Sequence, residues 1–191
     1  MLMLPTIIVI AIVALIVLWA IAIYNRLVRQ RALVKEGFSG ITVQLRRRAD
    51  LVPNLVSTVQ GYAAHEKGVL TEVTAHRADA TTASTVAATA QADTAFTGML
   101  GRLMAVAEAY PDLKADANFR QLQTELADIE EQLQSARRYY NATVRDLNSS
   151  IQSFPNVLFA RPLGFSEAEF YADDDASIQQ APKVQFGTTQ G

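Results

Sequence analysis

The chain has 191 residues, a formal net charge of −2 and no cysteine. The lack of cysteine excludes disulfides, thiolate zinc sites and cysteine nucleophiles. The sequence pI of about 5.7, together with cations that lack interleaved aromatic residues, argues against nucleic-acid binding. The charge is uneven along the chain. Residues 1–48 carry seven bases and one acid, residues 49–164 carry nine bases and thirteen acids, and residues 165–191 carry one base and five acids.

The first 23 residues carry no charge and predict a membrane anchor. A helix over residues 6–23 would be about 27 Å long, close to the roughly 30 Å hydrocarbon core. Trp19 and Tyr24 stand near its end, where amphipathic rings favour the headgroup level. The small residues Ala20 and Ala22 also allow a cleaved signal peptide, but no positive segment precedes the apolar run, so retention is favoured.

Seven bases follow the anchor against the single acid Glu36. The positive-inside rule therefore predicts a short outer N-terminus and a cytoplasmic remainder, in a bacterial inner membrane. These bases either attract anionic lipid headgroups or serve only to fix the topology. The predicted lipid-facing cluster is Arg26, Arg29, Arg31, Lys35, Arg46, Arg47 and Arg48.

Apolar residues at helical spacing predict that the anchor continues as an amphipathic helix through residues 34–59. Pro53 interrupts this series, and an interior proline costs about 3 kcal/mol. It either kinks one long helix or turns the chain between two. A turn would give four helices and bring the C-terminal aromatics back to the membrane, whereas a kink would give three helices and leave them distal.

The middle of the chain is rich in alanine and threonine, and a loop is expected near residues 80–88. A helix then resumes and ends at Tyr110-Pro111. Residues 112–115 form a short connection, so the flanking helices should be antiparallel neighbours.

A heptad series predicts a long final helix with Asp116 as its N-cap and a stop at Phe154-Pro155. The groove should loosen at the polar seam positions Thr143 and Ser150. The seam residues are Phe119, Leu122, Leu126, Ile129, Leu133, Ala136, Tyr140, Leu147 and Phe154.

The sequence thus predicts an all-α chain, an anchor continuing into an antiparallel bundle of three to four long helices with coiled-coil-like packing. We expect the anchor at 1–23, the bundle at 24–154, an aromatic segment at 155–171 and a disordered acidic and polar tail at 172–191. The aromatic segment is predicted either to mediate association or to cap the open end of the bundle. Its candidate residues are Phe159, Phe165, Phe170 and Tyr171.

Three asparagines stand where a buried amide could fix helix register. Asn141 and Asn148 lie seven residues apart beside seam positions, and Asn54 follows Pro53. The alternative is that these asparagines are exposed or capping.

No motif for catalysis or cofactor binding emerges. His65-Glu66 lacks the second histidine of a zinc-protease motif, since position 69 is valine. A surface metal pair of His65 and His76 would need further ligands. The carboxylates between Glu125 and Glu131 fit a solvated helix face. We therefore expect no enzyme, no metal and no cofactor.

Several strings, in order over roughly residues 24–171, resemble the LemA family of single-pass bacterial membrane proteins. The most specific are QLRRRADLVPNLV at residues 44–56 and AYPDLKA at residues 109–115. Others are YNRLV at 24–28, GYAAHE at 61–66 and ARRYYN at 136–141. The resemblance implies a helical bundle on an N-terminal anchor without established catalytic activity. It also implies links to membrane organisation, including magnetosome membranes, and to membrane-bound zinc peptidases.

The expected function is a non-enzymatic, membrane-anchored helical scaffold that self-associates and organises membrane or membrane partners. The alternative is an adaptor or regulator of a membrane-bound protease, which rests on the resemblance alone. The expected partners are membrane lipid, further copies of the chain and, in the alternative, a membrane-bound peptidase.

Overall fold

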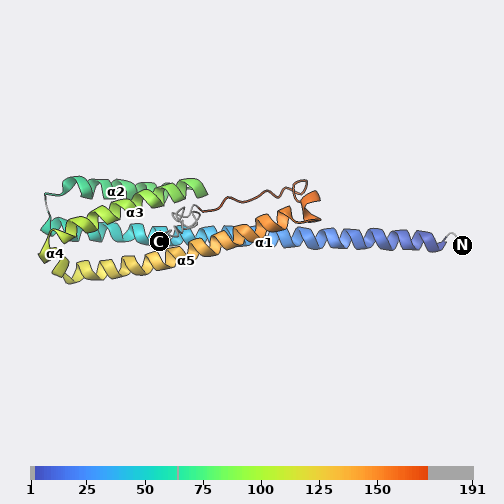
Figure 1. The fold of residues 1–191 in the computed structure, drawn as a ribbon, viewed down its shortest axis with the longest axis horizontal. Coiled ribbons are helices and arrows are strands. Elements are labelled where there is room, and N and C mark those ends of the chain that lie inside the picture. The colour runs from blue at the N-terminus through green and yellow to red at the C-terminus, as the bar shows by residue number, and fades with distance from the viewer. Residues whose placement is uncertain (1–2, 64, 172–191) are drawn as a thin grey trace, which may run out of the picture.

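A computed structural model describes residues 3–63 and 65–171, and within them the chain is helical without strands. The helices are α1 (Met3–Tyr62), α2 (Lys67–Thr82), α3 (Val86–Glu108), the short α4 (Pro111–Ala115) and α5 (Ala117–Gln152), followed by the 3-10 turn η1 (Asn156–Leu158). Figure 1 shows α1 as a rod that extends well beyond the other helices at its N-terminal end. The predicted all-α bundle is confirmed, and the predicted tail at 172–191 lies outside the described residues.

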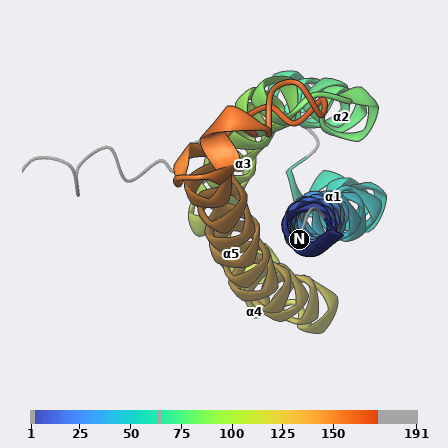
Figure 2. The same cartoon turned by 90° about the vertical axis from the view of Figure 1, so that its right-hand side faces the viewer.

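The four long helices alternate in direction. Viewed along the long axis, α2, α3 and α5 form an arc with α1 on its inner side (Figure 2). The N-terminal part of α1 has one segment long and apolar enough to cross a membrane. Its side chains face outward, with Leu15 and Leu18 about two-thirds exposed.

Pro53 does not turn the chain, because α1 continues through it to Tyr62. The chain turns instead between the end of α1 at Tyr62 and the start of α2 at Lys67. Pro53 has no N–H for the carbonyl of Ala49, one helical turn earlier. That carbonyl accepts a 2.8 Å hydrogen bond from Nε of Arg77 on α2, which replaces the missing helical donor. The expectation that an unbroken first helix gives three helices and a distal C-terminal segment is therefore wrong.

The predicted α1 and α5 seams pack against each other along most of the bundle. Gly37 marks a close approach, since a Cβ there would lie only 3.1 Å from Cα of Tyr140. Thr143 and Ser150 do not loosen the groove, because both are buried with hydrogen-bond partners. Phe154 is wrong as a seam residue: α5 ends at Gln152, and its side chain is 81% exposed.

The predicted connections hold with small shifts. Asp116 is the N-cap of α5 and accepts a 2.9 Å hydrogen bond from the backbone N–H of Phe119. The alanine- and threonine-rich loop is shorter than expected, because only residues 83–85 separate α2 from α3. Thr85 caps α3 through its side chain. The connection at 112–115 lies in α4, which begins at Pro111.

Candidate functional site

Charged side chains divide the interior of the bundle into two apolar clusters. The cluster nearer the anchor extends along α1 from Ile23 to Leu45, and the distal cluster extends along α1 from Val52 to Val59. Arg48 lies between them and is only 2% exposed. We call Arg48, Asp93, Glu130 and Arg137 the ionic layer.

Arg48 reaches from α1 to both neighbouring helices. Its guanidinium forms an ion pair with Asp93 on α3 and a 2.8 Å ion pair with Glu130 on α5. It also donates a 3.0 Å hydrogen bond to the hydroxyl of Thr97. The ring of Phe96 lies 5.1 Å from the guanidinium carbon, a cation–π distance. One side chain therefore joins three helices.

Asp93 is the centre of the layer and is 1% exposed. One carboxylate oxygen pairs with Arg48. The other pairs with Arg137 and accepts a 2.8 Å hydrogen bond from the hydroxyl of Tyr171. The two guanidiniums balance the two carboxylates of Asp93 and Glu130, so the layer is formally neutral. Such pairing is what a buried charge requires.

The pKa values of Tyr171 and Arg137 are both raised. Burial raises the pKa of Tyr171, and the adjacent carboxylate of Asp93 raises it further, so the phenol remains a donor. Burial alone would lower the pKa of Arg137, but the charges of Asp93 and Glu130 outweigh it, and the net shift is upward. Both carboxylate oxygens of Asp93 are engaged, so the arrangement suits cross-linking of helices rather than proton transfer.

Part of the ionic layer lines a groove. A groove of about 410 Å³ between α3 and α5 is lined by apolar side chains, among them Leu100, Met104 and Leu126. Arg48 and Glu130 also line it, and Glu130 is 34% exposed.

An extended C-terminal segment, residues 165–171, lies along α5, and we call it the strap. Asn148 holds it with two hydrogen bonds to the backbone of Ala168, at 2.8 and 2.9 Å. Asn141 does the same to the backbone of Tyr171, at 2.9 and 3.2 Å. Each side-chain amide thus pairs with a backbone N–H and C=O, as a neighbouring strand would.

The structure gives the predicted register asparagines a different partner from the one expected. Asn141 and Asn148 align the strap on α5 rather than one helix on another. Asn54 is exposed on α1.

The predicted basic cluster is divided by the fold. Arg48 is wrong as a lipid-facing residue, because it is buried in the ionic layer. Arg47 donates to Gln132 on α5. Arg46 and Arg47 lie more than 30 Å along α1 from Ile23, at about 1.5 Å per residue, beyond the reach of a lipid headgroup. The remaining bases of the predicted cluster lie closer to the apolar span and are exposed. They are Arg26, Arg29, Arg31 and Lys35.

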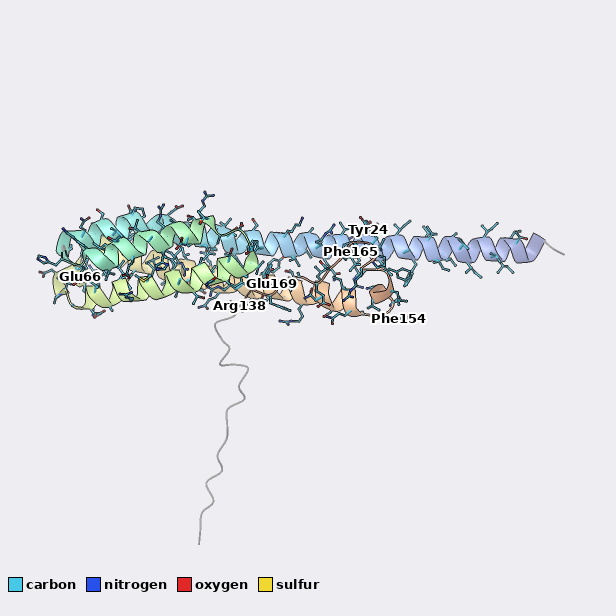
Figure 3. All side chains as sticks on the ribbon, turned by 90° about the horizontal axis from the view of Figure 1, so that it is seen from above. Tyr24, Glu66, Arg138, Phe154, Phe165 and Glu169 are labelled. Atoms are coloured by element: carbon cyan, nitrogen blue, oxygen red, sulfur yellow. The ribbon has the colours of Figure 1, made fainter. Side chains whose placement is uncertain are left out.

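The aromatic segment is also divided. Phe165 and Tyr171 are 3% and 2% exposed and belong to the apolar cluster nearer the anchor. They are wrong as an association surface, because their side chains are buried inside the bundle. Phe159 and Phe170 are exposed. Figure 3 shows Phe165 beside Tyr24, and their rings meet edge-to-face at 5.6 Å.

The side chains considered for metal chemistry are not brought together. Within the described residues, no group of three or more histidine, aspartate or glutamate side chains is placed to hold a metal ion. His65 is exposed. Nδ1 of His76 lies 3.9 Å from a carboxylate oxygen of Asp79.

Sequence reasoning missed Asp93 and Arg137 and misassigned Arg48. The signal was present in α1, where Arg48 continues the alternating four- and three-residue spacing of Ile41, Leu45 and Val52. In α3, Asp93 precedes Phe96 by three residues on the buried face. A charge at an apolar seam position predicts a buried partner.

Comparison with known proteins finds similarity over most of the chain. The LemA family profile matches residues 37–186. Protein LemA of Metamycoplasma hominis is 28% identical over 156 residues, which cover 78% of this chain and 69% of that protein. Magnetosome protein MamQ of Magnetospirillum gryphiswaldense is 33% identical over 85 residues, 44% of this chain.

Magnetosome protein MamQ 2 of Paramagnetospirillum magneticum is 34% identical over a stretch of the same length. In both MamQ proteins the match spans 31% of their length. The family match covers most of the chain, and the N-terminal part of α1 is long and apolar enough to cross a membrane. The chain belongs to the LemA family.

Proposed function

We propose that this protein is a non-enzymatic scaffold, anchored in the bacterial inner membrane, that self-associates and organises the membrane or membrane partners. The observation that carries the proposal is the unbroken course of α1 from the apolar span to Tyr62. At about 1.5 Å per residue this helix is about 90 Å long. No flexible linker separates anchor from bundle, so the bundle projects from the bilayer as one rod.

The ionic layer supports this reading. Its charged groups are used to join α1, α3, α5 and the strap. A cross-linked rod transmits position and orientation from the membrane to a distant surface. The MamQ relatives are named as magnetosome proteins, which fits a role in organising membranes.

The orientation follows from charge. The exposed bases Arg26, Arg29 and Arg31 follow the span directly, and the positive-inside rule places them with the bundle in the cytoplasm. The chain has no cysteine, so Lys67→Cys adds a single thiol at the exposed far end of the bundle. An impermeant maleimide should label this variant only after the cells are opened. Labelling of intact cells would reverse the proposed topology.

Self-association is tested by cross-linking mass spectrometry in native membranes that contain isotopically heavy and light copies. Links between heavy and light peptides are expected, because they require two copies in contact. Links within single copies only would contradict the scaffold. A peptidase linked in stoichiometric amount, without heavy-to-light links, would favour the adaptor role instead.

A further inference from the structure

The chain returns to the membrane end of α1 after α5. The segment from Phe154 to Leu163, here called the returning loop, contains η1 and precedes the strap. Figure 3 shows Phe154 at the anchor end of the bundle, while Glu66 lies at the opposite end. The rings of Phe159 and Trp19 meet edge-to-face, with centroids 6.1 Å apart. Trp19 lies inside the uncharged span.

The returning loop exposes large apolar side chains toward its surroundings. Phe154 is 81% exposed and Leu158 is 58% exposed, and three neighbours are at least 40% exposed. The three are Val157, Phe159 and Leu163. Five such residues within ten positions form a surface that water does not favour.

The inner side of this loop is fixed to the bundle. Ala160 is fully buried, and Phe165, just beyond the loop, is 3% exposed. The backbone N–H of Phe165 donates a 2.9 Å hydrogen bond to the carbonyl of Ala160. Gly164 has a φ of +78°, a conformation that favours glycine, where the chain turns into the strap. The exposed apolar side chains are thus held outward on an anchored turn.

We infer that the returning loop is a second membrane-inserted element, which lies in the bilayer interface beside α1. The occupant of its apolar surface is the bilayer because of the contact with Trp19. Trp19 precedes Ile23, the last residue of the uncharged segment, by about 6 Å at about 1.5 Å per residue, so it lies within the span. A bilayer that surrounds the span therefore meets Phe159 and its neighbours at the same depth.

The charges beside the loop fit this placement. Arg161 within it and Arg26 and Arg29 on α1 are exposed. An apolar surface bordered by cations is the pattern of an element that lies in the headgroup region. The inference rests on the membrane-anchored part of the proposed function and is independent of self-association.

The test uses the full-length chain in vesicles of phosphatidylcholine and phosphatidylglycerol. Leu158→Cys carries a nitroxide spin label, and collision rates with oxygen and with a nickel chelate on both sides of the membrane report its depth. Val43→Cys is the matched control, because Val43 is 52% exposed on α1 and lies about 36 Å from Trp19 at about 1.5 Å per residue. Phe154→Cys provides a second loop position.

We expect a several-fold higher ratio of oxygen to nickel collisions at positions 158 and 154 than at position 43. Equal ratios at the three positions would overturn the inference. Trp19, the chain's single tryptophan, reports the anchor separately through quenching by brominated lipid. Quenched Trp19 with water-exposed loop labels would refute the loop insertion alone. Unquenched Trp19 would refute the membrane anchor as well.

Discussion

Replacing Asp93 by asparagine should destabilise the bundle more than any single change of a surface charge. The substitution keeps the size of the side chain but removes the negative charge that faces Arg48, Arg137 and the Tyr171 hydroxyl. Both guanidiniums then share only Glu130, and the layer gains a net positive charge away from water. Breaking a buried pair on one side costs about 3–5 kcal/mol. The total free energy of unfolding of a domain is only about 5–15 kcal/mol.

The assay is urea unfolding of the full-length protein in detergent, followed by far-UV circular dichroism. With a slope of about 1–3 kcal/mol per molar urea, the midpoint should fall by at least about 1 M. The control is Glu108→Gln, which breaks the exposed 2.6 Å pair with Lys114 and should change stability by less than about 1 kcal/mol. The triple replacement of Arg48, Asp93 and Arg137 by methionine or leucine should recover much of the loss, since the one remaining charge of the layer, Glu130, is 34% exposed.

A stability of Asp93→Asn within about 1 kcal/mol of the wild type would refute this reasoning. Such a result would mean that the buried guanidiniums of Arg48 and Arg137 are stable without the negative charge of Asp93. If the triple variant were less stable than Asp93→Asn, the loss would reflect packing instead of uncompensated charge.

Three further predictions concern the contact between Arg77 and α1 near Pro53, the strap, and the dependence of stability on pH. Pro53→Ala should stabilise the protein by up to about 3 kcal/mol, and Arg77→Ala should cost less in that background than in the wild type; an additive double-mutant cycle would contradict the link. Asn148→Ala removes two hydrogen bonds, at about 0.5–1.5 kcal/mol each, and should hasten proteolysis within the strap, whereas the exposed Asn118→Ala should not. Tyrosine ordinarily ionises near pH 10, so the raised pKa of Tyr171 makes stability fall as pH rises above about 10, because only the unfolded state loses the proton. Tyr171→Phe should flatten this decline in thermal midpoint, and an unchanged slope would exclude Tyr171 as its source.

Much of the fold follows from periodicity. The apolar series of α1 and α5 identifies residues that the structure buries, from Ile41 to Val59 and from Phe119 to Leu147. Asp116 was recognisable as a cap because its side chain acts within its own first turn. Such features are local or repeat along one helix, so a single sequence contains them.

The position of the first turn of the chain could not be predicted from periodicity. Pro53 is the strongest local helix breaker in this region, yet the helix continues because Arg77, 24 positions later, supplies the missing donor. The chain turns only after α1 ends at Tyr62. A compensation between two helices is invisible to any local rule. The C-terminal segment meets the anchor because the chain still forms four long helices, with its first turn after Tyr62.

The ionic layer shows the same limit at the site. The seam position of Arg48 indicates a buried charge, but its partner could be any of thirteen acids in residues 49–164. Asp93 becomes the partner only because α2 carries the chain back, so that α3 runs in the same direction as α1 within the bundle. The spacing of Asn141 and Asn148 places them on one face of α5, but their partner is an extended segment without helical periodicity and not another helix.

The strap connects the two parts of the proposal. At one end Tyr171 enters the ionic layer through Asp93, and at the other end Phe165 packs against Tyr24 beside the returning loop. α5 holds the strap along its length, so the loop and α1 keep a fixed spacing. A bilayer that holds both the returning loop and the apolar span of α1 fixes the tilt of the bundle as well as its position. Two attachment points resist a rotation that a single inserted helix leaves free. Loss of the Asp93 carboxylate should therefore loosen the loop at the membrane as well as the bundle, although the two lie at different levels of the rod.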